Sequence, residues 1–318
     1  MEKCCENIQL NKMHLEGLRN SFLLPILSGL SEYLDSKDLL KLIEKLETLP
    51  GQEILDILGL DDNRYRTILE QALLISISQG VSEIGILSLN PFLAKNVFDT
   101  LGLSGIIYVR ASDLDDFRDM LNSNGEKIKF GVFVDPYVDG DELTNEVSDF
   151  CAKHKVSVMI NLYDELEKTG ELNSTYNLTP IEYVESIGLL DRDFKILGGV
   201  YADKDDFNLI SGYGGKIVVC PYESLNFGRG SPNVYAMQNS GVEVELSSPI
   251  INDIEREVEI TSVVSRGLLN DPNILEVSEV FEMAKIDKPR IELSEEVYKN
   301  TNQNYKQIIK GVLEKICR

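Results

Sequence analysis

Short apolar runs that alternate with amphipathic segments most constrain what this chain can fold into. The runs are rich in valine and isoleucine and are bounded by polar or turn-forming residues, as expected for buried strands. Between them, apolar residues recur three or four positions apart, for example at Leu93, Val97 and Leu101, which predicts helices. Such alternation predicts a parallel sheet covered by helices. The predicted strands two to eight are residues 81–88, 105–110, 127–135, 156–162, 194–200, 216–220 and 242–247.

A first strand predicted at residues 8–13 would bring the number of strands to eight. Eight parallel strands that alternate with helices predict an α/β fold of the (β/α)8 TIM-barrel type. Between residues 22 and 78 the apolar spacing is helical throughout. We expect residues 1–270 to form the barrel and residues 271–318 to form a C-terminal helical extension packed on it.

The C-terminal extension ends in an amphipathic segment. Its apolar face is formed by Tyr305, Ile308, Ile309, Val312 and Ile316. A face of this kind suits either a helix docked on the barrel or a helix that binds a partner, and the sequence leaves both alternatives open.

Charge and composition exclude several classes of partner. The 318 residues include 53 acidic and 31 basic side chains, which gives a formal net charge of −22. Nucleic acid and anionic membrane surfaces repel such a chain, so we expect neither as a partner. The sequence has no apolar run of about 18 residues and no N-terminal signal, which favours a cytoplasmic protein with reduced thiols. The five cysteines lack Cys-x-x-Cys spacing and do not predict a zinc ribbon.

Three of the predicted strands end in residues that identify a family. Strand five carries Asn161 and is followed by Asp164, strand six ends at Gly199, and strand eight is followed by Pro249. This block resembles the amidohydrolase superfamily, in particular the adenosine, S-adenosylhomocysteine and chlorohydrolase-type deaminases. There the corresponding strands normally end in His-x-x-Glu, in a catalytic His and in an Asp. The resemblance implies an amidohydrolase-like barrel in which these positions have changed.

Other segments match the same family in order and spacing. They are Thr179-Pro180-Ile181 with Gly188-Leu189-Leu190, Val219-Cys220-Pro221, and Lys12-Met13-His14-Leu15, which stands where these deaminases have His-x-His-Leu. These deaminases usually add a small β-sandwich built from both chain ends. We expect this chain to lack it, because the sequence starts at strand one and has no returning strands.

The family pattern, carried over position by position, leaves few metal ligands. His14 is the one ligand that it retains, whereas Lys12 has no lone pair at neutral pH and Asn161 offers a weak neutral oxygen. Gly199 has no side chain, and Pro249 lacks even a backbone N–H. A zinc, iron or manganese ion of the kind that the family uses needs about three protein ligands. We therefore expect no metal and no other cofactor, and we assign no catalytic residue.

Strand ends of a barrel converge, so these residues are predicted to surround one cavity that binds a ligand. Asp135, Asp164 and Glu223 follow strands four, five and seven and are expected at the same mouth. Two alternatives for these acids stay open: a rebuilt oxygen-ligand site for Mg²⁺ or Ca²⁺, or solvated and helix-capping roles. Lys12 either pairs with Asp164 in the pocket or extends to solvent.

The main functional hypothesis is a catalytically degenerate amidohydrolase-fold protein, a pseudoenzyme that binds a small molecule or a partner. The alternative is a metal-dependent amidohydrolase or deaminase that acts on C–N bonds of a purine-like or heterocyclic substrate with a rearranged site. A third hypothesis is a structural or regulatory subunit that forms a homodimer or pairs with an active relative. Adenosine and S-adenosylhomocysteine are the first ligands to test, because the resemblance implies them.

Overall fold

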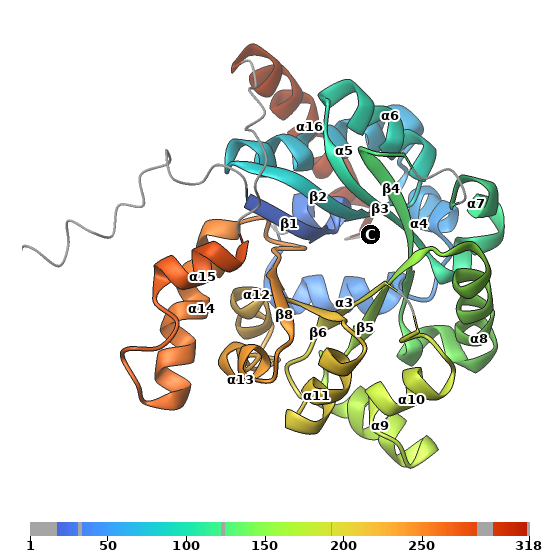
Figure 1. Ribbon diagram of the computed structural model, residues 1–318. Helices are drawn as coiled ribbons and strands as arrows, with labels where there is room; N and C mark the ends of the chain where they lie inside the picture. Colours follow the sequence, from blue (N-terminus) through green and yellow to red (C-terminus); the bar gives the residue numbers. More distant parts are fainter. Residues whose placement is uncertain (1–17, 31–33, 122–124, 192, 285–294, 317–318) are drawn as a thin grey trace, which may run out of the picture.

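Eight parallel strands surrounded by helices form the body of the molecule (Figure 1). The structure, a computed structural model, describes residues 18–30, 34–121, 125–191, 193–284 and 295–316. The sheet order follows the chain order from β1 to β8, and each strand pairs in parallel with the next. The strands are β1 (Leu18–Leu23), β2 (Val81–Leu87), β3 (Ser104–Arg110), β4 (Ile128–Val134), β5 (Ser157–Leu162), β6 (Phe194–Gly198), β7 (Lys216–Val219) and β8 (Glu243–Leu246).

Helices connect the strands and form the outer layer, which confirms the predicted α/β barrel architecture (Figure 1). The connection from β1 to β2 is the most elaborate and holds four helices before the second strand begins. The helices are α2 (Pro25–Leu30), α3 (Ser36–Leu46), α4 (Gly51–Leu58), α5 (Asp62–Ser78), α6 (Pro91–Leu101), the 3-10 turn η2 (Ala111–Asp113), α7 (Leu114–Leu121), α8 (Pro136–His154), α9 (Leu166–Tyr176), α10 (Pro180–Ser186), α11 (Lys204–Gly212), α12 (Pro221–Asn226), α13 (Val234–Asn239), α14 (Ile254–Leu269), α15 (Val277–Ala284) and α16 (Glu295–Ile316).

The first strand does not lie where the sequence predicts it. Residues 8–13 lie outside the described residues, and the strand that pairs with β2 is β1, whose sequence is LRNSFL. Arg19, Asn20 and Ser21 interrupt its apolar residues, so this strand gives no apolar run to detect. Its pairing with β2 also contains register shifts. Because of these polar interruptions the sequence did not predict a strand here, just before the stretch of helical spacing that begins at residue 22.

Helix starts follow the signals in the sequence. Thr179 caps α10, and its hydroxyl accepts from the Glu182 N–H while the Glu182 carboxylate accepts from the Thr179 N–H, which is the predicted capping box. Asp203 and Asp206 form the same reciprocal pair at α11. At α8 the capping residue is Asp135, the first residue after β4. A residue that ends a strand and caps the following helix has a fixed position at the barrel mouth.

The interior of the barrel holds a small apolar cluster of its own. Tyr108, Met159 and Val218 are fully buried there, separate from the larger core between the sheet and the outer helices. Leu24, Leu87, Ile106, Phe133 and Leu197 pack against this cluster. The cluster therefore closes the barrel below its C-terminal mouth, because side chains fill a barrel of this size rather than leave a pore.

The C-terminal residues pack on the outside of the barrel. Helix α16 contacts α5, and its Tyr305, Ile309 and Val312 side chains are buried. Helix α15 contacts α14 and β8. Of the two alternatives for the amphipathic segment, the structure has the docked helix, while the domain boundary at residue 270 stays a prediction. In the described part of the chain, no helix is both long and apolar enough to cross a bilayer.

Candidate functional site

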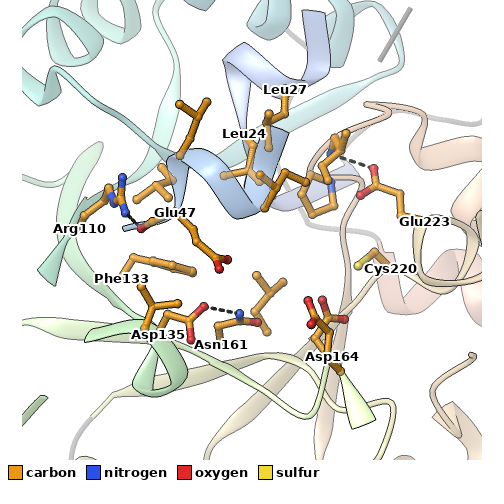
Figure 2. Close-up of a pocket in the computed structure, with 18 of the residues that line it drawn as sticks. Leu24, Leu27, Glu47, Arg110, Phe133, Asp135, Asn161, Asp164, Cys220 and Glu223 are labelled. Carbon is orange, nitrogen blue, oxygen red and sulfur yellow. Dashed lines mark hydrogen bonds between the residues drawn. The ribbon is translucent and has the colours of Figure 1, made fainter. Parts of the chain in front are cut away.

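A cavity of about 220 Å³ lies at the C-terminal ends of the strands (Figure 2). This volume is more than ten times the roughly 10–15 Å³ that one water molecule needs, so the cavity can hold an organic ligand. Strand ends of a barrel are also where active sites of this fold lie. The polar residues that line it are Glu47, Arg110, Asp135, Asp139, Asn161, Asp164, Glu165, Lys168, Cys220, Glu223, Ser224 and Arg229.

The cavity has an apolar side and a polar side. Figure 2 shows Leu24 and Leu27 on one side, facing Asp135, Asn161 and Asp164 on the other. Phe133 lies beside Asp135, so apolar side chains also border the polar side (Figure 2). Other apolar residues that line the cavity are Pro25, Ile43, Leu46, Ile54, Leu87 and Leu197. A ligand with a flat apolar body and a polar edge suits a cavity with this division.

Helix α3 covers the mouth of the cavity and contributes several of these residues. Its end is attached to the barrel by two basic side chains. Lys168 on α9 pairs with Glu47 at 3.4 Å between Nζ and Oε2. Arg110 at the end of β3 donates to the Leu49 carbonyl at 2.6 Å and also to the carbonyl of Glu47. Because Lys168 lies on α9 and Arg110 ends β3, these contacts attach the end of α3 to two other parts of the barrel and hold the helix over the cavity.

Asp135 and Asn161 form a hydrogen-bonded pair in the polar side. The Asn161 amide donates from Nδ2 to Asp135 Oδ2 at 2.7 Å. The other oxygen of Asp135 accepts from the Tyr137 N–H at 3.1 Å, as the cap of α8. Burial raises the pKa of Asp135 to about 7, although the hydrogen bond from Asn161 and the charge of Lys168 oppose this rise. Asp135 therefore titrates near neutral pH while it orients its neighbour.

Asp164 forms an ion pair with Arg229, which lies in the connection between α12 and α13. The same guanidinium reaches Glu165 Oε1 at 3.2 Å and lies 5.6 Å from the centre of the Phe227 ring. The Arg229 carbonyl accepts from the Tyr201 hydroxyl at 2.6 Å, which fixes the loop. Burial raises the pKa of Asp164, and the positive charge of Arg229 opposes that rise. The ion pair therefore favours the charged form of this carboxylate at the cavity wall.

Glu223 lies at the far end of the polar side and is held by three donors. Its Oε1 accepts from the backbone N–H groups of Ile250 at 2.8 Å and Ile251 at 2.5 Å and from the Ser248 hydroxyl at 3.1 Å. Burial raises the pKa of Glu223 to about 7. These bonds tie α12 to the loop after β8, so Glu223 organises the cavity wall.

A second buried acid supports Glu223 from outside the cavity. Glu257 on α14 accepts from the Tyr222 N–H at 2.7 Å and from the Glu223 N–H at 3.2 Å, at the start of α12. Burial, and then the neighbouring Glu223, raise the pKa of Glu257 well above its usual value. The sequence does not single out Glu257, because it is one of three alternating acids with Glu255 and Glu259, and such acids on an amphipathic helix resemble solvated residues.

Five of the predicted site residues line one cavity, and a sixth does not. Gly199 packs beside Met237 and Ile217, where an added Cβ would lie 3.0 Å from Met237 Cε. Its positive φ of 79° and this contact account for the glycine. Lys12 and His14 lie outside the described residues, and Asp164, the predicted partner of Lys12, pairs with Arg229. The cavity-lining predictions are Asp135, Asn161, Asp164, Glu223 and Pro249.

Sequence reasoning missed the basic residues of the site. Arg229, Lys168 and Arg110 line the cavity, and each contacts an acid or a carbonyl group there. Arg110 directly follows the apolar residues of a strand, a position that could have indicated it. Arg229 stands between two glycines that resemble turn residues, and Lys168 lies on a helix, so neither gave a signal.

The described residues do not by themselves fit a catalytic metal ion. Among them no three His, Cys, Asp or Glu side chains converge as a metal-binding group. Asp164 is paired with Arg229, and the one oxygen of Glu223 that accepts hydrogen bonds takes three of them. Burial and neighbouring acids raise the pKa of the Cys220 thiol, which keeps it protonated and a poor ligand. We therefore derive no chemical step through a metal.

No family model matches the chain. Among curated proteins it is similar to the 5-methylthioadenosine/S-adenosylhomocysteine deaminase of Caldicellulosiruptor saccharolyticus, with 27% identity over 184 residues that cover 55% of this chain and 42% of the relative. The enzyme of the same description from Bacillus cytotoxicus is 24% identical over 154 residues, which cover 47% of this chain and 35% of that protein. The aligned parts thus span less than half the length of these relatives.

Solved structures share the fold at low sequence identity. A guanine deaminase from C. acetobutylicum with bound guanine has a TM-score of 0.71 and 17% identity, over 93% of this chain and 83% of that one. An adenosine deaminase from Xanthomonas campestris with bound zinc has a TM-score of 0.67 and 16% identity, over 85% and 65%. The zinc complex of atrazine chlorohydrolase from Arthrobacter aurescens has a TM-score of 0.70 and 15% identity, over 85% and 69%.

These comparisons correct two expectations from the sequence. The hypothesis of a non-catalytic protein is contradicted, because the relatives in sequence are named as deaminases and so are two of the neighbours in structure. The expectation of no metal cofactor is contradicted by the neighbours that hold zinc. Both errors arose because four changed residues were given more weight than the rest of the barrel.

The relatives in sequence and the neighbours in fold agree with the resemblance that the motifs indicate. The chain is similar in sequence to deaminases of the amidohydrolase superfamily and shares the barrel fold of solved deaminases.

Proposed function

We propose that this chain is a hydrolytic deaminase with a rearranged site, which cleaves an exocyclic C–N bond of a purine-like or other heterocyclic amine. The observation that carries the proposal is a buried carboxylate, Asp164, in a half-apolar cavity at the strand ends of a barrel. The names of the relatives support the class of reaction.

The apolar residues that line the cavity suit the ring of such a substrate. Leu24, Leu87, Phe133 and Leu197 line the cavity and pack on the buried cluster inside the barrel, so their positions are fixed. A ring that enters among these apolar residues leaves water and buries its faces, which favours binding by roughly 25 cal/mol per Å² of apolar surface. Its amino edge is then directed at the carboxylates.

Asp164 is the residue that we assign to proton transfer. In hydrolytic deamination a water oxygen bonds to the ring carbon, a proton leaves that water, and the amine departs as ammonia after it gains a proton. A carboxylate takes the proton from water and later gives it to the leaving amine, so atoms and charges balance. The ion pair with Arg229 favours the ionised form of Asp164, which is the form that accepts a proton, and so opposes the rise that burial causes in its pKa.

A zinc ion like that of the solved neighbours would need ligands from outside the described residues, where the sequence has His14. We route no step through such an ion. Elemental analysis of the purified protein tests whether the chain binds such an ion, because it measures zinc, iron and manganese per chain.

The test is ammonia release from adenosine, S-adenosylhomocysteine and guanine by the full chain, as purified and after addition of zinc, iron or manganese. We expect turnover of at least one of them, and a loss of about 10²- to 10⁴-fold in Asp164→Asn. Asp149→Asn, an exposed change on α8, serves as the matched control and should keep full activity. If none of the three compounds releases ammonia under any metal condition, the proposal is wrong.

We extend the proposal to location and assembly. A net charge of −22 supports a cytoplasmic protein without a nucleic-acid or membrane partner. The exposed Val263, Leu268 and Leu269 on α14 support self-association or pairing with an active relative. Light scattering at several protein concentrations tests the first of these two assemblies, and co-purification tests the second.

A further inference from the structure

Asn161 presents an amide with unused hydrogen-bonding capacity to the cavity. A primary amide carries two N–H donors and a carbonyl oxygen with two acceptor sites. Asp135 accepts from Nδ2 at 2.7 Å and is the one hydrogen-bond partner of this amide within the described residues. The carbonyl oxygen and the second N–H therefore remain for a ligand in the cavity that Asn161 lines.

Asp135 fixes which way the amide points. A carboxylate only accepts hydrogen bonds, so it must face the NH₂ group of Asn161; a flipped amide would place two oxygens together. Asp135 cannot turn away easily, because its second oxygen caps α8 through the Tyr137 N–H at 3.1 Å. Its own N–H donates to Asp139 at 2.7 Å. The orientation of Asn161 is thus set from outside the cavity.

We infer that Asn161 determines specificity by selecting an amino-substituted heterocycle over the oxo-substituted ring that deamination produces, and that Asp135 is the positioning residue for its amide. This inference rests on the proposed function, which provides the ring and its amino group. The Asn161 carbonyl oxygen accepts from the exocyclic amine. In the oxo product, held in the same place, a carbonyl oxygen meets the Asn161 oxygen, and two acceptors repel.

The difference in binding follows from the cost of an unsatisfied or repelled polar group in a buried site. Such groups change affinity by roughly ten- to a hundredfold. A free amide would rotate to suit either ring and would discriminate little. The hydrogen bond from Asn161 to Asp135 therefore holds the amide in one orientation, and this makes the amide selective for a ligand that carries an amino group.

The experiment compares the dissociation constants of adenosine, inosine and purine riboside, which lacks a substituent at that ring position. Calorimetry is done in the cold, and each nucleoside is recovered and chromatographed to verify that it is unchanged. We expect the wild-type protein to bind adenosine at least tenfold more tightly than inosine. Asn161→Leu should bring this ratio close to one by weakening adenosine, and should leave purine riboside unchanged within about threefold.

Asp135→Asn tests the positioning role separately. Asparagine caps helices as well as aspartate does, so α8 keeps its start. The new amide can donate to the Asn161 oxygen as well as accept from its nitrogen, so Asn161 is no longer held in one orientation. The adenosine-to-inosine ratio should fall severalfold while the melting temperature stays close to that of the wild type, an outcome that a purely structural role would not produce.

Two exposed changes serve as matched controls: Asn208→Leu on α11 and Asp149→Asn on α8 should keep the wild-type ratio. If Asn161→Leu does not fold, Asp135→Asn still carries the test. Equal binding of adenosine and inosine to the wild type, or an unchanged ratio in the folded variants, would overturn the inference and leave the proposed function standing. Binding of none of the three nucleosides would instead count against the proposed purine-like ligand itself.

Discussion

Arg229 and Asp164 form an ion pair at the wall of the cavity, although 65 positions separate them in the chain. The pair joins the loop after β5 to the connection that precedes β8. Both side chains are mostly buried, with 18% and 16% of their surface exposed. A buried charge that loses its partner is costly, so this pair controls both the stability and the charge of the site.

Removal of the cation should destabilise the protein. We expect Arg229→Met to lower the free energy of unfolding by about 3 kcal/mol, because the mostly buried Asp164 loses the cation that offsets its burial. A further change, Asp164→Leu, should recover part of that loss. Urea denaturation measures both. As a comparison, Arg118→Met on α7 removes the ion pair with Glu146, in which the two side chains are 41% and 46% exposed. This change should cost under about 1 kcal/mol. Equal losses at the two arginines would contradict the prediction.

The stability of the protein should fall as the pH rises from about 4.5 to 7. Burial raises the pKa of Glu223 to about 7 in the folded state. Its stabilising contribution is complete below the unfolded value and is lost as the pH passes through the folded one. In Glu223→Gln this fall should be smaller by on the order of 1–3 kcal/mol. Unfolding measured between pH 4 and 8 tests this, with the exposed Glu167→Gln as a control that should keep the wild-type profile.

Discrimination between amine and oxo ligands should depend on pH. Burial raises the pKa of Asp135 to about 7, with Asn161, Lys168 and Tyr137 opposing the rise and Asp139 adding to it. Above that pH the carboxylate can only accept, and it holds the Asn161 amide in one orientation. Below it the protonated acid can also donate, so the amide is held less firmly. The adenosine-to-inosine affinity ratio should be severalfold higher at pH 8 than at pH 6, and flat in Asp135→Asn; a flat wild-type ratio would exclude the titration of Asp135 as the cause.

The rates at which a ligand enters and leaves the cavity under helix α3 should depend on salt concentration. Glu47→Gln removes the ion pair with Lys168, in which both side chains are 25% exposed. A pair of that kind contributes about 0.2–1 kcal/mol, so ligand association and dissociation should both become up to about fivefold faster. The difference from the wild type should shrink at high ionic strength. Stopped-flow binding measures it. Asp99→Asn, which breaks the pair with Lys95 on α6, should change neither rate.

The seven later strands could be predicted from sequence because each contains a short run of mostly apolar residues, most of which are buried. The ends of these strands also located Asp135, Asn161, Asp164 and Glu223 in one cavity, because parallel strands in a barrel present their carboxyl ends together. The first strand could not be found this way. Polar residues interrupt LRNSFL, and its place in the sheet depends on pairing with β2 rather than on its own apolar residues.

The partners of the acids were not predictable from their spacing. Asp164 pairs with Arg229 because a loop from another strand brings the guanidinium there, and the conformation of such a loop follows from packing. Gly199 shows the opposite failure. Its place after β6 suggested the cavity, but its backbone turns toward Met237 on the outer side. The position of a residue along a strand predicts at which end of the barrel the residue lies. The direction in which its side chain points is known only from the structure.

The backbone N–H of Leu24, just after β1, donates to the carbonyl of Pro249, just after β8, at 2.8 Å. Both residues also line the cavity. A ligand that contacts both residues would therefore stabilise the junction between the first and last strands of the barrel. Ligand binding should slow hydrogen exchange at the Leu24 amide more than at amides of β3 or β4. Exchange at this amide would therefore measure how stably the barrel is closed.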